Sequence, residues 1–137
     1  MLKAATGELV LVRFSPMNQD RFVRQATDDA DYRESLGEER IWAISAYGDC
    51  LGEGETVEAL VSRICEEAEC GGPRIWLITG GTLSREGYDA VLSEPPPHHY
   101  DVIIGSELGT EDRSRLVESV GKLAGLFGPG REKNPAC

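Results

Sequence analysis

The sequence predicts an α+β fold: a single domain with a mixed β-sheet of about five strands covered by two main amphipathic helices. Short runs of apolar, β-branched and aromatic residues recur between glycine and proline breaks, which is typical of strands. Two longer segments carry apolar residues at helical spacing. The 137 residues can bury a core without disulfides or metal. We assign residues 1–128 to this domain and 129–137 to a flexible, polar C-terminal tail.

The predicted sheet is built from apolar runs that alternate with turn-forming residues. Strands are expected near 8–14, 40–47, 74–79 and 99–105, with a weaker fifth strand at 88–92. The run 74–79 is apolar on both faces, so we expect it at the centre of the sheet. Pro95, Pro96 and Pro97 cannot donate backbone hydrogen bonds, and they therefore belong to a connection outside the sheet.

The two main helices are expected at 56–70 and 111–127, where apolar residues recur at intervals of three and four. Shorter helical pieces are expected as well. Ser15-Pro16 is typical of a helix start, for a helix that ends near Thr27. Residues 28–36 then form a second short piece, with acidic residues at its start as the helix dipole prefers. One helical turn is expected at 82–86, and Thr110 is a candidate N-cap.

The hydrophobic core is predicted from the inward positions of these elements. Its expected members are Val10, Val12, Trp42, Ile44, Leu60, Ile64, Ile75, Leu77, Val102, Ile104, Leu116, Val120 and Leu123.

The charge balance is strongly acidic, with 24 acids against 14 bases and a net charge of −10. This argues against nucleic-acid binding and against docking on anionic lipid, because both need a basic surface. It favours a basic protein partner. No apolar run is long enough to span a membrane, and the first residues lack the apolar core of a signal peptide. We therefore expect a cytoplasmic protein with free cysteines.

Metal and thiol chemistry is weakly indicated. Cys50, Cys65, Cys70, His98 and His99 have the donor atoms that zinc prefers, but no pair has the spacing of a zinc motif. Cys50 could pair with His98 or His99 as a thiol nucleophile, although the acidic residues beside it disfavour a thiolate. We predict neither a structural metal nor a disulfide. The two glycine-rich turns that follow strands are acidic or lack lysine, which indicates plain turns.

Two further sets of polar residues could form a functional site instead of being ordinary surface residues. His98, His99 and Tyr100 enter a strand after the triple proline, and form a possible polar site for acid–base or pH-sensitive contacts. Four acids could gather a divalent ion, but without the spacing of a calcium loop they are better explained as a solvated helix start. These acids are Asp28, Asp29, Asp31 and Glu34.

Three further residues follow the order of a known pattern. Arg13 lies on the first strand, Ser45 on the second, and Glu107 late in the chain. This arrangement resembles the ADP-ribosyltransferase family, with Tyr47 and Gly105 departing from the family's pattern. The resemblance implies that NAD is the cofactor. It also implies that the arginine grips the pyrophosphate, the serine orients the substrate and the glutamate holds a ribose hydroxyl.

Two functions therefore follow from the sequence. The first is a small, acidic, protein-binding or accessory module of the immunity or antitoxin kind, which docks a basic partner and needs no cofactor. The alternative is an NAD-dependent, ADP-ribosyltransferase-like enzyme or toxin that uses Arg13, Ser45 and Glu107. The acidic balance favours the first, and the ordered triad favours the second.

Overall fold

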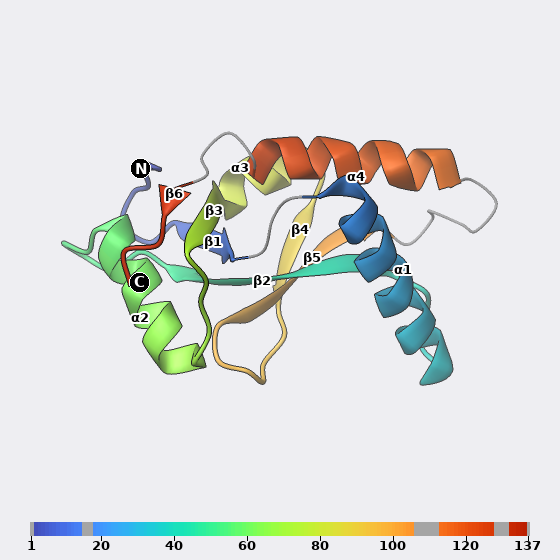
Figure 1. Ribbon diagram of the computed structural model, residues 1–137, viewed down its shortest axis with the longest axis horizontal. Helices are drawn as coiled ribbons and strands as arrows, with labels where there is room; N and C mark the ends of the chain where they lie inside the picture. Colours follow the sequence, from blue (N-terminus) through green and yellow to red (C-terminus); the bar gives the residue numbers. More distant parts are fainter. Residues whose placement is uncertain (1, 15–17, 106–112, 128–131, 137) are drawn as a thin grey trace.

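The computed structural model describes residues 2–14, 18–105, 113–127 and 132–136, and it is an α+β fold as the sequence predicts (Figure 1). In chain order the elements are β1 (Leu9–Arg13), α1 (Gln19–Ser35), β2 (Trp42–Cys50), α2 (Val57–Ala68), β3 (Arg74–Thr79), α3 (Gly80–Arg85), β4 (Asp89–Leu92), β5 (His99–Gly105), α4 (Arg113–Phe127) and β6 (Glu132–Lys133).

The strands form one six-stranded sheet in the order β4-β5-β2-β1-β3-β6. Every described strand pair is antiparallel, whereas the sequence analysis expected a mixed sheet. The difference arises because β2 and β3 run in the same direction but β1 lies between them. The β2–α2–β3 crossover therefore spans β1 and makes no parallel neighbours. β1 and β2 occupy the two central positions, and β3 lies next to the two-residue edge strand β6.

The sheet has a hydrophobic cluster on each face. Leu11, Ile44 and Val102 point to the face covered by α1, α3 and α4. Val10, Val12 and Leu77 point to the other face, where α2 packs. This alternation confirms the predicted core, because all thirteen of its members are buried. They are Val10, Val12, Trp42, Ile44, Leu60, Ile64, Ile75, Leu77, Val102, Ile104, Leu116, Val120 and Leu123.

The first helix differs from the sequence prediction in one respect that matters for function. The sequence predicts one helix ending near Thr27 and another piece at 28–36, but α1 is one helix of 17 residues. A buried stripe of Phe22, Ala26 and Ala30 runs through the expected break at intervals of four residues. Asn18 caps the helix, accepting a hydrogen bond from the Arg21 N–H. The expected start at Ser15-Pro16 lies outside the described residues.

The second strand is longer than predicted. β2 continues through Gly48 to Cys50, where the sequence indicated a loop. Gly48 is required there because an added Cβ would lie 2.6 Å from Leu11 Cδ2 and 2.7 Å from the Val10 carbonyl oxygen. A glycine in the middle of a strand therefore marks close contact with β1 rather than a turn.

The other helices lie close to their predicted ranges. α2 begins after Thr56, whose side chain caps it by accepting from the Ala59 N–H at 3.1 Å. α4 ends at Phe127 as expected, and its candidate cap Thr110 is outside the described residues. No helix in the described ranges combines the length and apolar character needed to cross a membrane.

Part of the segment assigned to the tail is attached to the sheet. Glu132 and Lys133 form β6 and pair with β3. Asn134 is fully buried, and its side-chain amide donates to the Gly72 carbonyl at 2.8 Å. Its backbone N–H donates to the Pro73 carbonyl at 3.0 Å. These bonds fix the chain after β6 against the loop that precedes β3.

Candidate functional site

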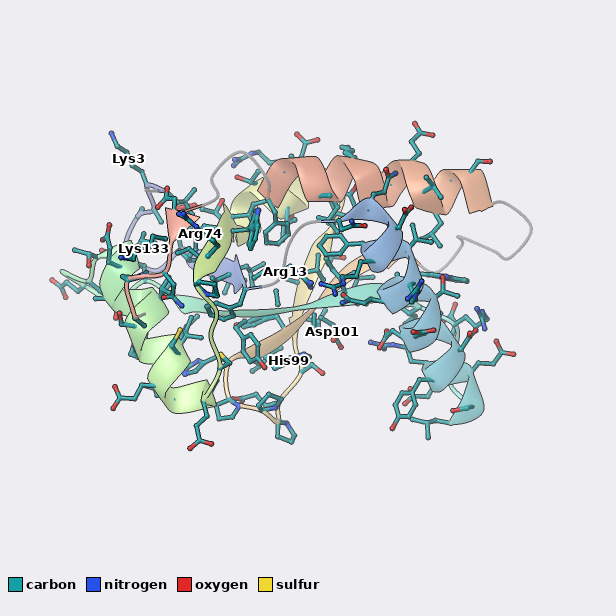
Figure 2. The ribbon with its side chains drawn as sticks, in the orientation of Figure 1. Lys3, Arg13, Arg74, His99, Asp101 and Lys133 are labelled. Atoms are coloured by element: carbon teal, nitrogen blue, oxygen red, sulfur yellow. The ribbon has the colours of Figure 1, made fainter. Side chains whose placement is uncertain are left out.

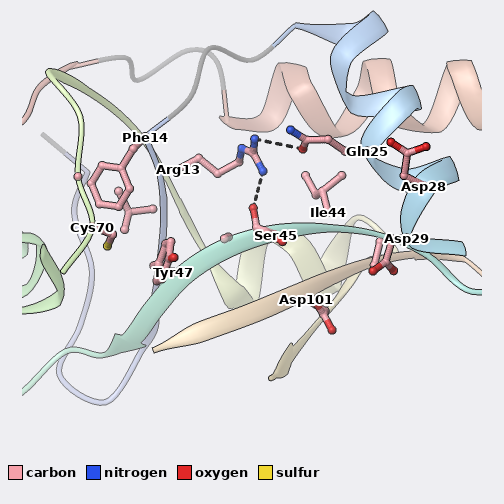
Figure 3. Close-up of a pocket in the computed structure, with 14 residues that line it drawn as sticks. Arg13, Phe14, Gln25, Asp28, Asp29, Ile44, Ser45, Tyr47, Cys70 and Asp101 are labelled. Atoms are coloured by element: carbon pink, nitrogen blue, oxygen red, sulfur yellow. Dashed lines mark hydrogen bonds between the residues drawn. The ribbon is translucent and has the colours of Figure 1, made fainter. Parts of the chain in front are cut away.

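A cleft of about 470 Å³ opens where β1 ends and β2 continues (Figure 3). β1 stops at Arg13, while β2 extends past it toward Trp42. One wall comes from α1 and the other from Phe14 and the loop after α2, with β2 between them. The polar and aromatic residues that line the cleft are Arg13, Phe14, Gln25, Asp28, Asp29, Ser45, Tyr47, Cys70 and Asp101.

Arg13 is the buried cation of this cleft, with only 5% of its surface exposed. Nη1 donates a short hydrogen bond to the Ser45 carbonyl, and Nη2 lies 3.5 Å from Gln25 Oε1. The guanidinium also stacks 4.5 Å from the centre of the Phe22 ring. Burial, and to a smaller extent the charge of Arg21, lowers the pKa of Arg13 to about 10. The group is therefore still charged at neutral pH.

The structure brings together two of the three residues of the transferase-like pattern. Arg13 and Ser45 are hydrogen-bonded, but through the serine carbonyl and not through its hydroxyl. The Ser45 side chain is exposed, and Ser45 lies opposite Asp101 in the β2–β5 register. Glu107 lies outside the described residues.

Beside the cleft, Arg33 joins α1 to the sheet. Its Nε donates to Asp29 at 2.9 Å, one helical turn away, and its Nη2 donates to Asp101 on β5 at 3.0 Å. The hydrogen bond to Asp29 is the main cause that raises the pKa of Arg33. Two carboxylates thus share one arginine, and the group keeps a net negative charge.

Arg40 repeats this arrangement near the end of α1. Its Nη1 lies 2.6 Å from both Asp31 and Glu34, whose side chains are largely exposed. Both acids lie in the C-terminal half of the helix, where the helix dipole disfavours negative charge. The sequence analysis placed them at a helix start, where the dipole would have stabilised them. The ion pairs with Arg40 compensate only part of this unfavourable interaction between the two carboxylates and the helix dipole.

A third arginine with two carboxylates lies at the other end of β2. Arg63 on α2 donates to Asp49 at 2.6 Å and to both oxygens of Glu55 at 3.0 Å. Burial acts to raise the pKa of Asp49, but the hydrogen bonds from Arg63 and the Cys50 N–H outweigh it and hold that pKa below its usual value. Hydrogen bonds from Arg63 and the Gly52 N–H likewise lower the pKa of Glu55.

These lowered pKa values predict how stability depends on pH. A carboxyl whose pKa is depressed by folding stabilises the native state above its unfolded pKa of about 4, and this contribution is lost as the pH falls through the folded value. We expect Arg63→Met to lower the melting temperature at neutral pH and to lower it progressively less below pH ~4. Melting curves across this pH range test the prediction. Arg74→Met, in an exposed residue of β3, is the control, and an equal effect of Arg63→Met at every pH would contradict it.

The predicted histidine site does not converge on one point. His98 lies between two carboxylates: Nε2 contacts Glu67 on α2, and Nδ1 is 3.5 Å from Asp49. The next residue, His99, instead has Nδ1 2.9 Å from the Ser93 carbonyl and its ring edge-on to Tyr47. These contacts of His98 hold the β4–β5 connection against α2.

Tyr100 takes a third direction and packs against the core cluster under α1 and α4. Burial, helped by nearby Cys50 and acids, raises the pKa of its hydroxyl. The three adjacent residues therefore make three separate contacts.

The cysteines have no catalytic partner in the described part of the chain. Cys50, Cys65 and Cys70 form no disulfide within the described ranges. His98, one of the two histidines considered as a partner of Cys50, contacts Glu67 and Asp49 instead. Burial, followed by the neighbouring Cys65, raises the pKa of Cys70 to about 11, so this cleft-lining thiol is protonated at neutral pH. No group of three histidine, cysteine or acidic residues within the described ranges is arranged to hold a metal ion.

An exposed apolar pair lies at the C-terminal end of α1, with Tyr32 in the last turns of the helix and Leu36 at its C-cap. Tyr32 is 63% and Leu36 58% exposed, and the two are one helical turn apart. Helical spacing aligns them with Gln25, Asp28 and Asp29, which line the cleft. We call these five residues the α1 stripe. Large apolar side chains exposed together among carboxylates are typical of contact surfaces for other molecules.

Several residues of this region were not found from the sequence. Gln25 and Asp101 reach the cleft only because α1 and β5 fold beside β2, and no local pattern marks them. The pair of Asp29 and Arg33 has the i, i+4 spacing of a helical ion pair, and that signal could have found it.

Comparison with known proteins finds no matching family model, no matching curated protein and no matching solved structure.

Proposed function

We propose that the protein acts by binding a basic macromolecular partner through the α1 stripe and the carboxylates beside it. The observation that carries this proposal is that three arginines each share their charge with two carboxylates, so the acidic excess remains on the surface. Two of these groups, around Arg33 and Arg40, border the exposed Tyr32 and Leu36. Aromatic anchors within a charged rim are the usual composition of a binding hot spot.

Basic and acidic residues are mixed at the end of the molecule opposite α1. Lys3, Arg74 and Lys133 lie toward the β3–β6 side, at the far end of the molecule from α1 (Figure 2). Arg74 and Lys133 are cross-strand neighbours and both are exposed. The acids of α2, which include Glu58, Glu66 and Glu67, lie at this same end (Figure 1). Charge alone therefore does not select the α1 end, and the exposed Tyr32 and Leu36 supply that selection.

The second candidate function is that of an ADP-ribosyltransferase-like enzyme, in which Arg13, Ser45 and Glu107 would act on NAD. The observation that favours it is the direct contact of Arg13 with Ser45 at the edge of a cleft. Arg13 and Ser45 line the cleft to which Gln25, Asp28 and Asp29 of the α1 stripe also belong, so one set of experiments separates the two candidate functions.

The test is capture of a partner at two salt concentrations, followed by titration of the purified pair. The tagged protein is expected to retain a basic protein from cell extract at low salt, and the purified complex should weaken steadily as ionic strength rises. The double variant Asp31→Asn, Glu34→Gln should weaken it further. Its matched control, Glu58→Gln with Glu66→Gln, removes the same charge from exposed positions of α2 and should have a much smaller effect.

Two results would contradict the proposal. One is an equal loss of affinity in both double variants, which would make the effect a matter of net charge alone. The other is transfer of ADP-ribose from NAD in the same extract, abolished by both Arg13→Ala and Glu107→Ala. That outcome would replace the binding function by the enzymatic one.

A further inference from the structure

Among the residues that the structure describes, Arg13 carries a buried charge without a counter-ion. Only 5% of the Arg13 surface is exposed to solvent, and no carboxylate among the described residues pairs with its guanidinium group. Buried arginines are normally paired, because an uncompensated charge in a protein interior destabilises the fold. Its neighbours are a carbonyl, an amide and an aromatic ring, which carry no net charge.

The hydrogen-bonding capacity of Arg13 is also only partly used. A guanidinium has five N–H donors, and the described contacts occupy one on Nη1 and, at the long distance of 3.5 Å, one on Nη2. Nε has no acceptor within the described part of the chain. Gln25, which forms the weak contact, is an exposed side chain on α1 and can move aside without disturbing the core.

We propose that the cleft at Arg13 binds a small oxyanion, either a carboxylate or a phosphate group of a ligand. Such a group supplies the missing negative charge, and its two oxygens match two neighbouring guanidinium N–H groups. Ser45 and Tyr47 also belong to the lining of this cleft. The inference is independent of the proposed partner, because it depends only on the charge and contacts of Arg13.

The carboxylates of the cleft set the expected strength of binding. Asp29 and Asp101 are engaged by Arg33, which compensates part of their charge. Asp28 is exposed and has no basic partner among the described residues, so it repels an incoming anion. Removing the Asp28 charge should therefore strengthen oxyanion binding, whereas removing the Arg13 charge should abolish it.

The test follows the Arg13 Nε–H signal in ¹H–¹⁵N spectra of the full chain. The signal is assigned by its disappearance in Arg13→Met. Sodium phosphate and sodium acetate are titrated separately, with sodium chloride at equal ionic strength as the reference. A saturable shift with either oxyanion, absent with chloride, is expected, and the titrant that binds at lower concentration identifies the phosphate or carboxylate source. Asp28→Asn should lower the half-saturating concentration about two- to threefold, while Asp20→Asn, at an exposed position outside the cleft, should not.

A signal that stays fixed in both titrations, or that moves equally with chloride, would overturn the proposal. Arg13 would then be a structural residue that satisfies the Ser45 carbonyl. Arg13→Lys keeps the positive charge and also lacks the Nε–H group of arginine, so it assigns the signal where Arg13→Met folds poorly. Variants at Tyr32 leave the oxyanion titration unchanged, so its failure is distinguishable from failure of the partner proposal.

Discussion

Leu123→Ala is expected to lower the free energy of unfolding by about 2–5 kcal/mol, the range for deleting a fully buried leucine side chain. Leu123 is completely inaccessible to solvent and belongs to the cluster in which α4, α1 and the sheet meet. The loss combines the transfer of apolar atoms with the cavity left behind, because a packed core relaxes only in part. Leu60→Ala should cause a loss in the same range, since Leu60 is equally buried where α2 packs on the opposite face of the sheet.

Urea unfolding followed by circular dichroism gives both values. Leu36→Ala is the control, because this leucine is 58% exposed and its truncation should change stability by no more than ~0.5 kcal/mol. A similar small effect of Leu123→Ala would show that α4 does not pack on the sheet as described.

The secondary structure was predictable because its signals are local. The spacing of Val57, Leu60, Val61 and Ile64 marks one buried helical face, and α2 confirms it. The strand order was not predictable, because it depends on which distant segments pair. β1 is inserted between β2 and β3, and nothing within five residues of Leu9–Arg13 records that both neighbours lie far along the chain.

The continuous first helix shows where a local signal misleads. Acids at Asp28 and Asp29 look like the favourable start of a new helix. The packing of Ala26 and Ala30 against the sheet keeps the helix unbroken, and the cost of acids in its C-terminal half is offset by Arg33 and Arg40. Tertiary contacts thus outweighed the preference of the dipole.

The candidate site was partly predictable for the same reason. Arg13 and Ser45 were singled out by their order on two strands, and those strands are neighbours. The burial of Arg13 was not predictable, since it depends on Phe22 and Gln25 folding over the end of β1. The contact of His98 with Glu67 likewise joins residues 31 positions apart.

The substitution Tyr32→Ala is expected to weaken binding of the basic partner about 30-fold, which corresponds to ~2 kcal/mol, the loss typical of an aromatic hot spot. The reason is that Tyr32 offers the largest exposed apolar surface of the α1 stripe and lies among carboxylates that attract the partner. Calorimetric titration of the purified pair measures the change. Alanine is a better helix former than tyrosine, so a loss of fold does not explain lower affinity at this exposed position.

Two further variants make the result specific to the α1 stripe. Tyr32→Phe keeps the ring and should retain most of the affinity if the contact is apolar. Val91→Ala truncates another exposed side chain, 51% accessible on the edge strand β4, and should leave binding unchanged. Equal losses in Tyr32→Ala and Val91→Ala would move the interface away from α1. An unchanged affinity in Tyr32→Ala would leave only the carboxylates around Arg33 and Arg40 as the binding determinant. Binding would then be long-range attraction without a docked surface, and the proposed hot spot would be wrong. The reason is that steering charges alone change the rate of association more than the lifetime of a complex.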